Sequence, residues 1–376
     1  MIRFLEAVFI LTGMIIGVGM FAIPFSFAAA GFWLGTAELV VLAAVVLAMH
    51  LLYSEIVLAT PSFHRMPGYI RTHLGYGAAL FSWVSTLFGI AGTLLAYVVA
   101  GALFLHNIFV SIAPGADIFF WATLLTLAVA LITFFPLRKE AHFNGVLAFF
   151  EIAFIAGLAL FLLPKISISH LAGIHPENMF IPYGVLLFAL SGGSVVPDMI
   201  TILGRRRVRV RTAIVAGSLI PALLYSFFAL AVVGVTGPAT SSEAIAGLRP
   251  LVGADIVWWG SVVGLLAVFT SFIALSANFQ ALLHLDMKTP RMVAWLAASA
   301  APILLYLAGF QNFIAIIGSV GAVAFGIDAA LVIAAYNRMK KKSGMRPVSG
   351  IFHLLEAFII VMVIAGVIYE VTSIVF

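Results

Sequence analysis

The chain has 376 residues, of which 64% are hydrophobic and only 9% charged, with a mean hydropathy of +1.22 and a formal net charge of +5. A soluble domain carries about 25% charged residues, so this composition excludes a soluble protein and indicates a polytopic membrane protein. Apolar runs of about 20 residues without strict alternation favour spanning helices over a β-barrel. The sequence contains no cysteine, which excludes disulfides and thiolate metal sites.

The hydropathy pattern predicts an all-α protein with eleven transmembrane helices joined by short loops. The spans cover roughly 5–29, 34–59, 77–109, 119–136, 145–164, 180–204, 211–236, 254–285, 292–308, 312–337 and 351–374. The first span begins like a secretory signal. Because Glu6 interrupts its start and its apolar run is long, we interpret it as a spanning helix.

Basic residues fall almost entirely on one side of this topology. With the N-terminus in the cytoplasm, all but two of the 19 Lys and Arg residues lie in cytoplasmic segments, the exceptions being Lys165 and Arg249. Such an asymmetry follows the positive-inside rule, and one missed helix would scramble it. We therefore expect a cytoplasmic N-terminus and an outer C-terminus. A compact chain of this kind suits the inner membrane of a bacterium or an archaeon.

The first span carries helix-breaking residues at mid-membrane: Gly17, Gly19 and then Pro24. Gly costs about 1 kcal/mol relative to Ala in a helix interior, and Pro removes a donor and clashes with the preceding turn. Irregular backbone at membrane depth persists only where protein buries it or a wet cavity receives it. The pattern predicts a helix broken at a functional site. The alternative is a close helix–helix contact through small residues.

The sixth span repeats this pattern with Gly192, Gly193 and Pro197. The glycine-to-proline interval is five residues in both spans, and the two motifs are 173 residues apart. Interrupted helices at matching positions of two inverted halves are a strong sequence indication of a transporter site. Since each unit holds five spans, the second unit must be inverted relative to the first.

The predicted organisation is therefore a first repeat over 1–164, an inverted second repeat over 180–337 and an additional helix over 351–374.

A helix broken at mid-membrane presents free N–H groups from one half and free carbonyls from the other. Two facing breaks offer donors to a carboxylate and acceptors to an ammonium group, which suits a zwitterionic amino acid. The small residues leave room for a bulky neutral side chain, for example an aromatic one. Tyr97 of the third span fits either a substrate contact or a packed ring. The substrate-binding candidates are Gly17, Val18, Gly19, Met20, Tyr97, Phe188, Ser191, Gly192, Gly193 and Ala274.

Several of these segments resemble the amino acid–polyamine–organocation superfamily, and most closely its aromatic and hydroxy amino acid permease branch within the amino acid/auxin permeases. The segments that carry the resemblance are Gly13 to Pro24, Tyr53-Ser54-Glu55 through Pro61 to Pro67-Gly68-Tyr69, Phe188 to Pro197, and Thr270-Ser271-Phe272 followed by Leu285-Asp286. The resemblance implies the leucine-transporter fold, with two inverted five-helix units, an eleventh helix, and substrate held between the broken helices, against the third and eighth.

The resemblance also implies a sodium site, which relatives build from first-helix carbonyls and eighth-helix hydroxyls. The matching positions here are Gly13, Ile16, Ala267, Thr270 and Ser271. The alternative for the two hydroxyls is a bond back to their own helix. Met20 stands where a second sodium site would need an amide, so we expect a single ion. The fifth span lacks the lysine of some proton-coupled relatives, which favours Na⁺ over H⁺.

Ionisable residues inside spans are costly and are candidates for function. Asp198 and Asp328 are candidates for gating or proton coupling, as is Glu38, which equally fits a side chain that reaches water. Glu55 and Glu151 lie toward the cytoplasmic ends, where we expect salt bridges.

These features predict a secondary active transporter of neutral amino acids that works by alternating access with Na⁺ as its coupling ion. A proton-coupled symporter and an exchanger remain alternatives. An enzyme is disfavoured because the sequence has neither a His-Glu-x-x-His pair nor a Gly-x-Ser-x-Gly elbow. A channel is disfavoured because paired breaks suit an occluding site. The expected partners are the substrate and the lipid bilayer, without nucleic acid or an organic cofactor. The sequence leaves the oligomeric state open, and a monomer fits.

Overall fold

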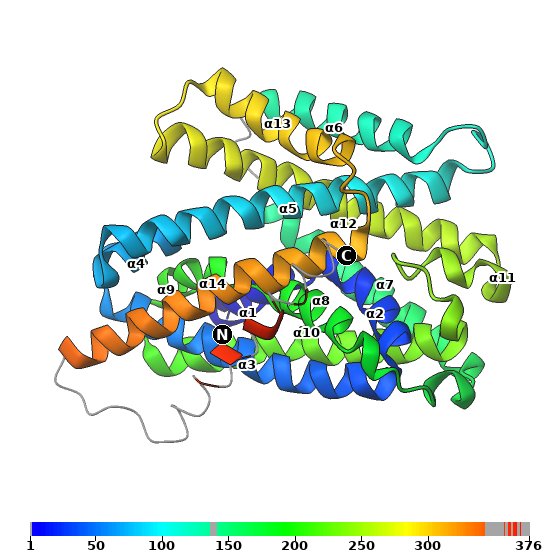
Figure 1. The fold of residues 1–376 in the computed structure, drawn as a ribbon, viewed down its shortest axis with the longest axis horizontal. Coiled ribbons are helices and arrows are strands. Elements are labelled where there is room, and N and C mark those ends of the chain that lie inside the picture. Colours follow the sequence, from blue (N-terminus) through cyan, green and yellow to red (C-terminus); the bar gives the residue numbers. More distant parts are fainter. Residues whose placement is uncertain are drawn as a thin grey trace.

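The chain folds into a bundle of helices (Figure 1). The structure is a computed structural model that describes residues 2–135 and 141–342 and isolated positions from 357 to 369, without the side chains of 141–149, 285 and 286. No strand occurs in these ranges, which confirms the all-α prediction. The α-helices are α1 (Ile2–Ile15), α2 (Ile23–Ala30), α3 (Phe32–Ala59), α4 (Met66–Leu74), α5 (Tyr76–Phe109), α6 (Ile118–Phe134), α7 (Ala141–Leu162), α8 (Phe180–Leu190), α9 (Val196–Leu203), α10 (Arg207–Thr236), α11 (Arg249–Val252), α12 (Ala254–Ala281), α13 (Arg291–Leu307) and α14 (Phe313–Lys342).

Short helical turns connect or extend these helices. They are the 3₁₀ turns η1 (Val18–Ala22), η2 (Leu163–Lys165), η3 (Ile168–Leu171), η4 (Pro176–Asn178), η5 (Gly193–Val195), η6 (Gly237–Ala239) and η7 (Ala246–Leu248), and the π-helical turn η8 (Leu282–Asp286).

Among the described residues, six helical segments are long and apolar enough to cross a membrane. They are built on α3, α5, α8 with α9, α10, α12 and α14. A seventh span is the pair Ile2–Ile15 and Val18–Ala30, bent by 48°, and α6 and α13 are shorter apolar helices. The predicted span 351–374 lies largely outside the described residues. Where it is described, Tyr369 stacks on Phe180 of α8, with 4.9 Å between the ring centroids.

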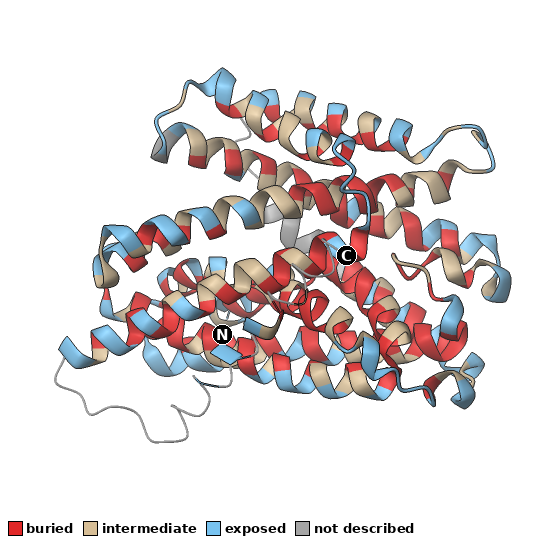
Figure 2. Cartoon of the chain, in the orientation of Figure 1, coloured by how far each residue is buried: buried red, intermediate tan, exposed pale blue. Residues whose placement is uncertain are grey.

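The broken helices lie in the densely packed part of the bundle. Contacts join α1 and α2 to α10, and α8 to α14 and α3. Helices α6 and α13 lie side by side at one edge of the molecule and pack against α5 and α12 (Figure 1). Figure 2 shows that buried residues concentrate around α2, α8 and α10, whereas α6 and α13 carry a larger share of exposed and half-exposed positions. The apolar core is therefore centred on the broken helices.

One end of the bundle, here called the basic end, gathers cationic side chains. Its residues are Arg65, Arg205, Arg207, Arg211, Arg291 and Lys340–Lys342. Glu55 at the end of α3 pairs with Arg207 and Arg211 of α10, each at 2.8 Å, as expected for this glutamate. Arg205 donates to the carbonyls of Val57, Leu58 and Thr60 at 3.0, 2.7 and 2.9 Å. A cation on the free carbonyls of a helix C-terminus is stabilising, so these contacts fix α3 to the chain that follows α9.

The opposite end is covered by loops that bond to helix ends. The His175 amide donates to the Ala30 carbonyl at 2.8 Å, which ties the loop before α8 to the end of α2. Glu243 is buried and accepts from the Ala246 amide at 3.0 Å. Leu248, in the turn that follows, is fully buried. This end of the bundle is therefore closed by packed chain.

Candidate functional site

Two helices are interrupted in the same manner near the centre of the bundle. Helix α1 ends at Ile15, and the chain passes through Gly17 and η1 into α2, which has Pro24 in its first turn. Helix α8 ends at Leu190, and the chain passes through η5 into α9, which has Pro197 in its first turn. The predicted breaks are present, and each proline lies where a helix lacks an amide partner in any case.

One buried tyrosine bonds to both broken helices. The Tyr225 hydroxyl, on α10, lies 2.7 Å from the Ile15 carbonyl and 3.1 Å from the Ala189 carbonyl, and donates to both. These carbonyls belong to the last turns of α1 and α8, which have no helical partner for them. Tyr225 therefore shares its hydroxyl proton between a buried free carbonyl on each side and holds the two breaks next to one another.

Two of the candidate glycines serve close packing between the broken helices. A Cβ on Gly19 would stand 2.8 Å from the Phe188 ring and 3.0 Å from the Ala189 Cα, and a Cβ on Gly192 would stand 2.7 Å from Ile15. Ordinary contacts of this kind are 3.4–4 Å. In this conformation Gly19 and Gly192 therefore permit a close helix–helix contact, which is the alternative that the sequence left open.

Gly17 differs from them, because a Cβ built there meets no atom within 4 Å. Its φ of −155° is extended backbone that any residue adopts, so local conformation does not require glycine. Open space beside a broken main chain is what a bound ligand needs. Gly17 is therefore the glycine of the first break that faces free volume.

A histidine fixes the second break. The Gly192 amide donates to His50 Nε2 at 3.3 Å, and His50 Nδ1 lies 3.2 Å from the Ser218 hydroxyl. Because an amide can only donate, Nε2 must be the bare nitrogen, and Nδ1 carries the proton toward Ser218. His50 is therefore a neutral, buried ring that links α3, α10 and the break, and it also lies beside Gly193.

The third and eighth spans meet at Tyr97. Its phenol lies near the Ser271 side chain, and its ring lies 6.2 Å from the Phe272 ring between centroids. The Thr270 hydroxyl donates to the Leu266 and Ala267 carbonyls at 3.0 and 3.3 Å, which is the bond back to its own helix considered as the alternative. This bond uses the hydroxyl hydrogen and leaves oxygen lone pairs.

The remaining candidates of the site lie on the same elements. Val18 and Met20 are buried in η1, and Phe188 and Ser191 are half-buried at the end of α8, where the Ser191 hydroxyl donates back to the Leu187 carbonyl at 2.7 Å. Of the candidates not yet described, Gly13 and Ala274 are half-buried, and Ile16 and Ala267 are buried. Helix α12, which carries the eighth-span residues, packs against η1.

The intramembrane carboxylates have different surroundings. Asp328 of α14 accepts from Ser85 of α5 at 2.9 Å. Asp198 is exposed in the first turn of α9. Both oxygens of Glu38 lack a hydrogen-bond partner among the described residues. The Glu151 side chain is buried, and no ion pair within the described ranges involves it. Arg138 and Lys139, before the fifth span, lie outside the described residues, so the salt bridge expected for Glu151 stays a prediction.

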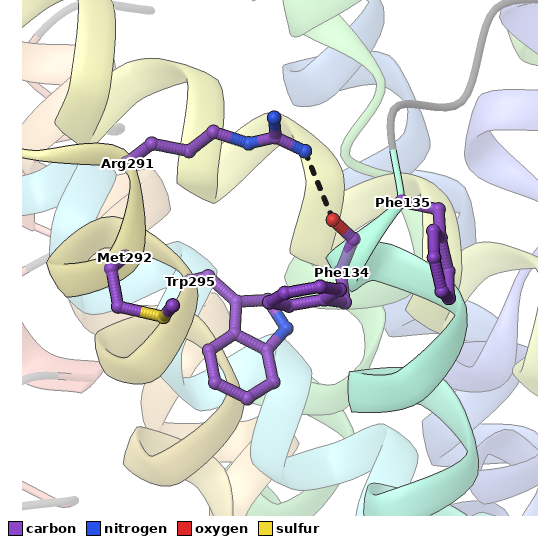
Figure 3. A pocket seen from close by; sticks show the side chains of 5 residues that line it. All are labelled: Phe134, Phe135, Arg291, Met292 and Trp295. Atoms are coloured by element: carbon purple, nitrogen blue, oxygen red, sulfur yellow. Dashed lines mark hydrogen bonds between the residues drawn. The ribbon is translucent and has the colours of Figure 1, made fainter.

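A hollow of about 450 Å³ lies away from the breaks, at the basic end between α6 and α13 (Figure 3). It is lined by Phe134, Phe135, Arg291, Met292 and Trp295. Arg291 donates to the Phe134 carbonyl at 2.9 Å, drawn as the dashed line in Figure 3. The lining is almost wholly apolar and offers no paired donors and acceptors for a zwitterion, so we do not assign it to the substrate.

The model of the tryptophan/tyrosine permease family matches residues 2–371. The chain belongs to this family. Glutamine transporter 2 of Aliivibrio fischeri is 21% identical over 342 residues, which cover 89% of this permease and 88% of that relative. The permease is thus a transporter and not an enzyme.

Solved structures share the fold of the permease. MhsT in complex with L-phenylalanine is 14% identical and has a TM-score of 0.65 over 97% of this chain and 98% of that chain. Mhp1, a nucleobase-cation-symport-1 family transporter in a closed conformation with bromovinylhydantoin bound, is 14% identical with a TM-score of 0.63 over 98% and 91%. The resemblance predicted from the sequence is confirmed: the protein is a permease of the leucine-transporter fold.

Sequence reasoning missed the bonding roles of two residues that organise the site of the permease, Tyr225 and His50. A tyrosine in an apolar span gives no signal that separates a bonding role from packing. His50 does give one, because an imidazole inside a span needs partners. Within the described part of the chain, no group of three or more His, Asp or Glu residues could hold a metal ion.

Proposed function

We propose that this permease is a secondary active transporter of a neutral aromatic amino acid, bound between the two breaks. The observation that carries the proposal is the pairing of the breaks through Tyr225, with free volume at Gly17 beside them. Donors from one half-helix and acceptors from the other suit a carboxylate and an ammonium group on one molecule. The side chain would then lie against Tyr97 and Phe272. Of the predicted set, Gly17, Ser191, Gly193 and Ala274 are the positions we expect to line the substrate.

The family and the relatives support this substrate class in different ways. The family is that of tryptophan and tyrosine permeases, whereas the relative from Aliivibrio fischeri is named for glutamine. All three amino acids share the zwitterionic backbone that the breaks would bind. The test therefore has to include glutamine beside the aromatic amino acids.

We further propose the inverted repeat, over residues 2–162 and 180–342 of the described chain. The support comes from the contacts between helices. Each of the following contacts has a counterpart that is obtained when every helix is replaced by its equivalent in the other repeat. The contact of α1 and α2 with α10 corresponds to that of α8 and α9 with α3, and α8 with α14 corresponds to α1 with α7. Likewise α5 with α6 corresponds to α12 with α13, and α5 with α14 to α12 with α7. The eleventh helix at 351–374 stays part of the proposal.

The proposed orientation places the basic end in the cytoplasm of a bacterial or archaeal cell, with the first helix starting there. The positive-inside rule supports it. Beside the breaks, Met14 is 46% exposed, and Ser194 and Asp198 are exposed, all on the basic-end halves of the broken helices. The opposite halves are buried beneath the covering loops. This pattern fits a permease open toward the cytoplasm, with Asp198 and the Asp328–Ser85 bond as gating contacts.

We propose Na⁺ as the coupling ion, carried at a single site made by Gly13, Ile16, Ala267, Thr270 and Ser271. Carbonyl and hydroxyl oxygens are the hard ligands such an ion prefers. The Thr270 oxygen keeps its lone pairs while its hydrogen is used within α12. Met20 is fully buried, which supports the expectation that no second ion binds beside it. A proton-coupled symporter is the alternative.

Uptake into proteoliposomes tests the proposal. Labelled tryptophan, tyrosine, phenylalanine and glutamine are offered with and without an inward Na⁺ gradient, and we expect accumulation of an aromatic amino acid above its equilibrium level. Failure of every amino acid to accumulate or to exchange would remove the substrate class. Ion leak independent of substrate would favour a channel instead.

Thr270→Ala tests the ion site. We expect a higher Na⁺ concentration for half-maximal uptake, with substrate binding retained at saturating Na⁺. Thr126→Ala is the matched control, since the Thr126 hydroxyl also bonds back to its own helix, to Ala122 at 2.8 Å, but lies in α6 at the edge of the bundle. Equal Na⁺ dependence of both variants would exclude Thr270 as a ligand.

A further inference from the structure

Glu151 of α7 is a buried carboxylate whose charge nothing in the described chain balances. Its residue is 6% exposed, and its Oε1 oxygen has no hydrogen-bond partner among the described residues. Glu55 and Asp328, in contrast, bond to arginines and to a serine. Burying a charged group without a partner is costly, so such groups persist in membrane proteins where they bind a cation or a proton.

Helix α7, which carries Glu151, packs against helices of the candidate site. The Tyr97 hydroxyl of α5 and the Tyr225 hydroxyl of α10 both lie within electrostatic reach of the Glu151 carboxylate. Tyr225 is the residue that bonds to both breaks, and the Tyr97 ring lies 6.2 Å from the Phe272 ring of α12 between centroids. Helix α7 itself packs against α1, α10 and α12. The helix of Glu151 therefore joins the first break to α10 and to the eighth span.

Within the described ranges no ion pair neutralises Glu151, and Arg209 of α10 is exposed in the first turn of that helix. The paired arginines of α10, Arg207 and Arg211, bond to Glu55 at the basic end. Lys165 of η2 lies over the Phe161 ring, 5.0 Å from its centroid. The other charged residues of α1 and α12 are Arg3 and Glu6, in the first turns of α1, and Asp255, in the first turn of α12. Among the described residues, Tyr97 and Tyr225 are titratable groups on which the charge of Glu151 acts through space.

We propose that Glu151, buried where α7 packs against α1, α10 and α12, supplies the anionic group of the binding site for the monovalent cation that drives transport. The inference rests on the proposed function and adds to it a negative charge that the carbonyl and hydroxyl ligands lack. The cation is Na⁺ or a proton, which share the single positive charge that the carboxylate requires.

The physical reason for coupling is the energy of the unbalanced charge. Closing the bundle around a bare carboxylate would seal that charge in a medium of low dielectric, whereas the neutral carboxylate–cation pair closes at much lower cost. The closed states are therefore reached with the cation bound. Because α7 packs against α1 and against α10, whose Tyr225 bonds to both breaks, the same closure involves the substrate site. A cation that favours closure in this way raises the affinity of the substrate, and the substrate raises that of the cation.

Glu151→Gln tests the proposal, because glutamine keeps the shape and removes the charge. In proteoliposomes we expect this variant to exchange labelled for unlabelled substrate at a rate within about threefold of wild type, and its gradient-driven accumulation to fall at least about tenfold. Glu151→Asp keeps the charge and should restore part of the accumulation. Glu177→Gln is the control, because this exposed glutamate pairs only with His175, at 3.5 Å, on the opposite end. Accumulation by Glu151→Gln equal to that of wild type would overturn the inference.

A binding measurement without any amino acid separates this inference from the proposed function. Purified wild-type protein and Glu151→Gln are compared for binding of ²²Na⁺ and, by potentiometric titration, for the number of protons taken up. If the ion is sodium, we expect the ²²Na⁺ affinity of the variant to be at least tenfold lower than that of wild type. If the ion is H⁺, we expect the variant to bind one proton fewer. If the wild type transports no amino acid, the proposed function fails while this comparison still decides the cation site. Equal ²²Na⁺ and proton binding by both proteins would overturn the site whether or not transport is seen.

Discussion

The glycines of the first break give the sharpest test of the site, because two of them differ only in what surrounds them. We predict that Gly19→Ala destabilises the permease and that Gly17→Ala leaves it stable but weakens substrate binding. A Cβ on Gly19 would stand 2.8 Å from the Phe188 ring and 3.0 Å from the Ala189 backbone, whereas one on Gly17 meets nothing within 4 Å.

The size of the effect follows from these contacts. Either substitution reduces the freedom of the unfolded chain by a similar amount, worth about 0.4–1 kcal/mol, so this contribution cancels between the two variants. What remains is overpacking at Gly19, which costs about 1–3 kcal/mol. For a chain of 376 residues we expect a Tm difference of about 1–4 °C between the variants. At Gly17 the methyl enters the proposed substrate volume, and a misfit of this size weakens binding by about tenfold or more.

The assay is thermal unfolding of both purified variants in the same detergent, followed by binding of labelled L-tryptophan. Equal Tm values would refute the packing role of Gly19. Wild-type affinity in Gly17→Ala would refute the assignment of Gly17 to the substrate volume.

Three further predictions concern the contacts around the breaks and at the basic end. Tyr225→Phe leaves two buried carbonyls without their donor and should lower the unfolding free energy by about 1–3 kcal/mol; an unchanged Tm would contradict the bonding role. Arg205→Met removes three bonds to the end of α3 and, because the arginine is exposed, should lower the unfolding free energy by about 1–2 kcal/mol. Arg205→Lys should have an effect between those of wild type and Arg205→Met. We expect faster proteolysis of the loop after α3 in Arg205→Met, and an unchanged rate would contradict the role of these bonds. Burial and the nearby Lys342 lower the pKa of His73 from 6.5, so the unfolded chain takes up the proton first as the pH falls. The contribution of His73 to stability is then present above about pH 6.5 and is lost as the pH falls below it. We expect the Tm of wild type to fall more than that of His73→Gln over this range, and an equal fall in both proteins would exclude His73 as the cause.

The breaks themselves could be predicted from the sequence, because glycine and proline act on the backbone locally. The same residue types mark α1 and α8, and the equal glycine-to-proline interval identifies the pair. The use of each glycine could not be predicted. Gly17 and Gly19 are two residues apart in one motif, and only the approach of α8 makes one packed and the other open.

The partners of the breaks also lay beyond the sequence, since they come from distant parts of the chain. Tyr225 is 210 residues from Ile15, and His50 is 142 residues from Gly192. Hydropathy located Glu151 within a span but could not show which neighbours would face it. Nor could it show that Arg207 and Arg211 of α10 would bond to Glu55.

The central claim, that an aromatic amino acid binds between the two breaks, is tested most directly by a crystal structure with 5-bromotryptophan, using anomalous scattering to locate the bromine. We predict one strong peak between Gly17 and Ser191, on the side of Tyr97, with the carboxylate on the free amides of a break. A bromine peak confined to the hollow lined by Phe134 and Trp295, with no ligand density at the breaks, would contradict the account.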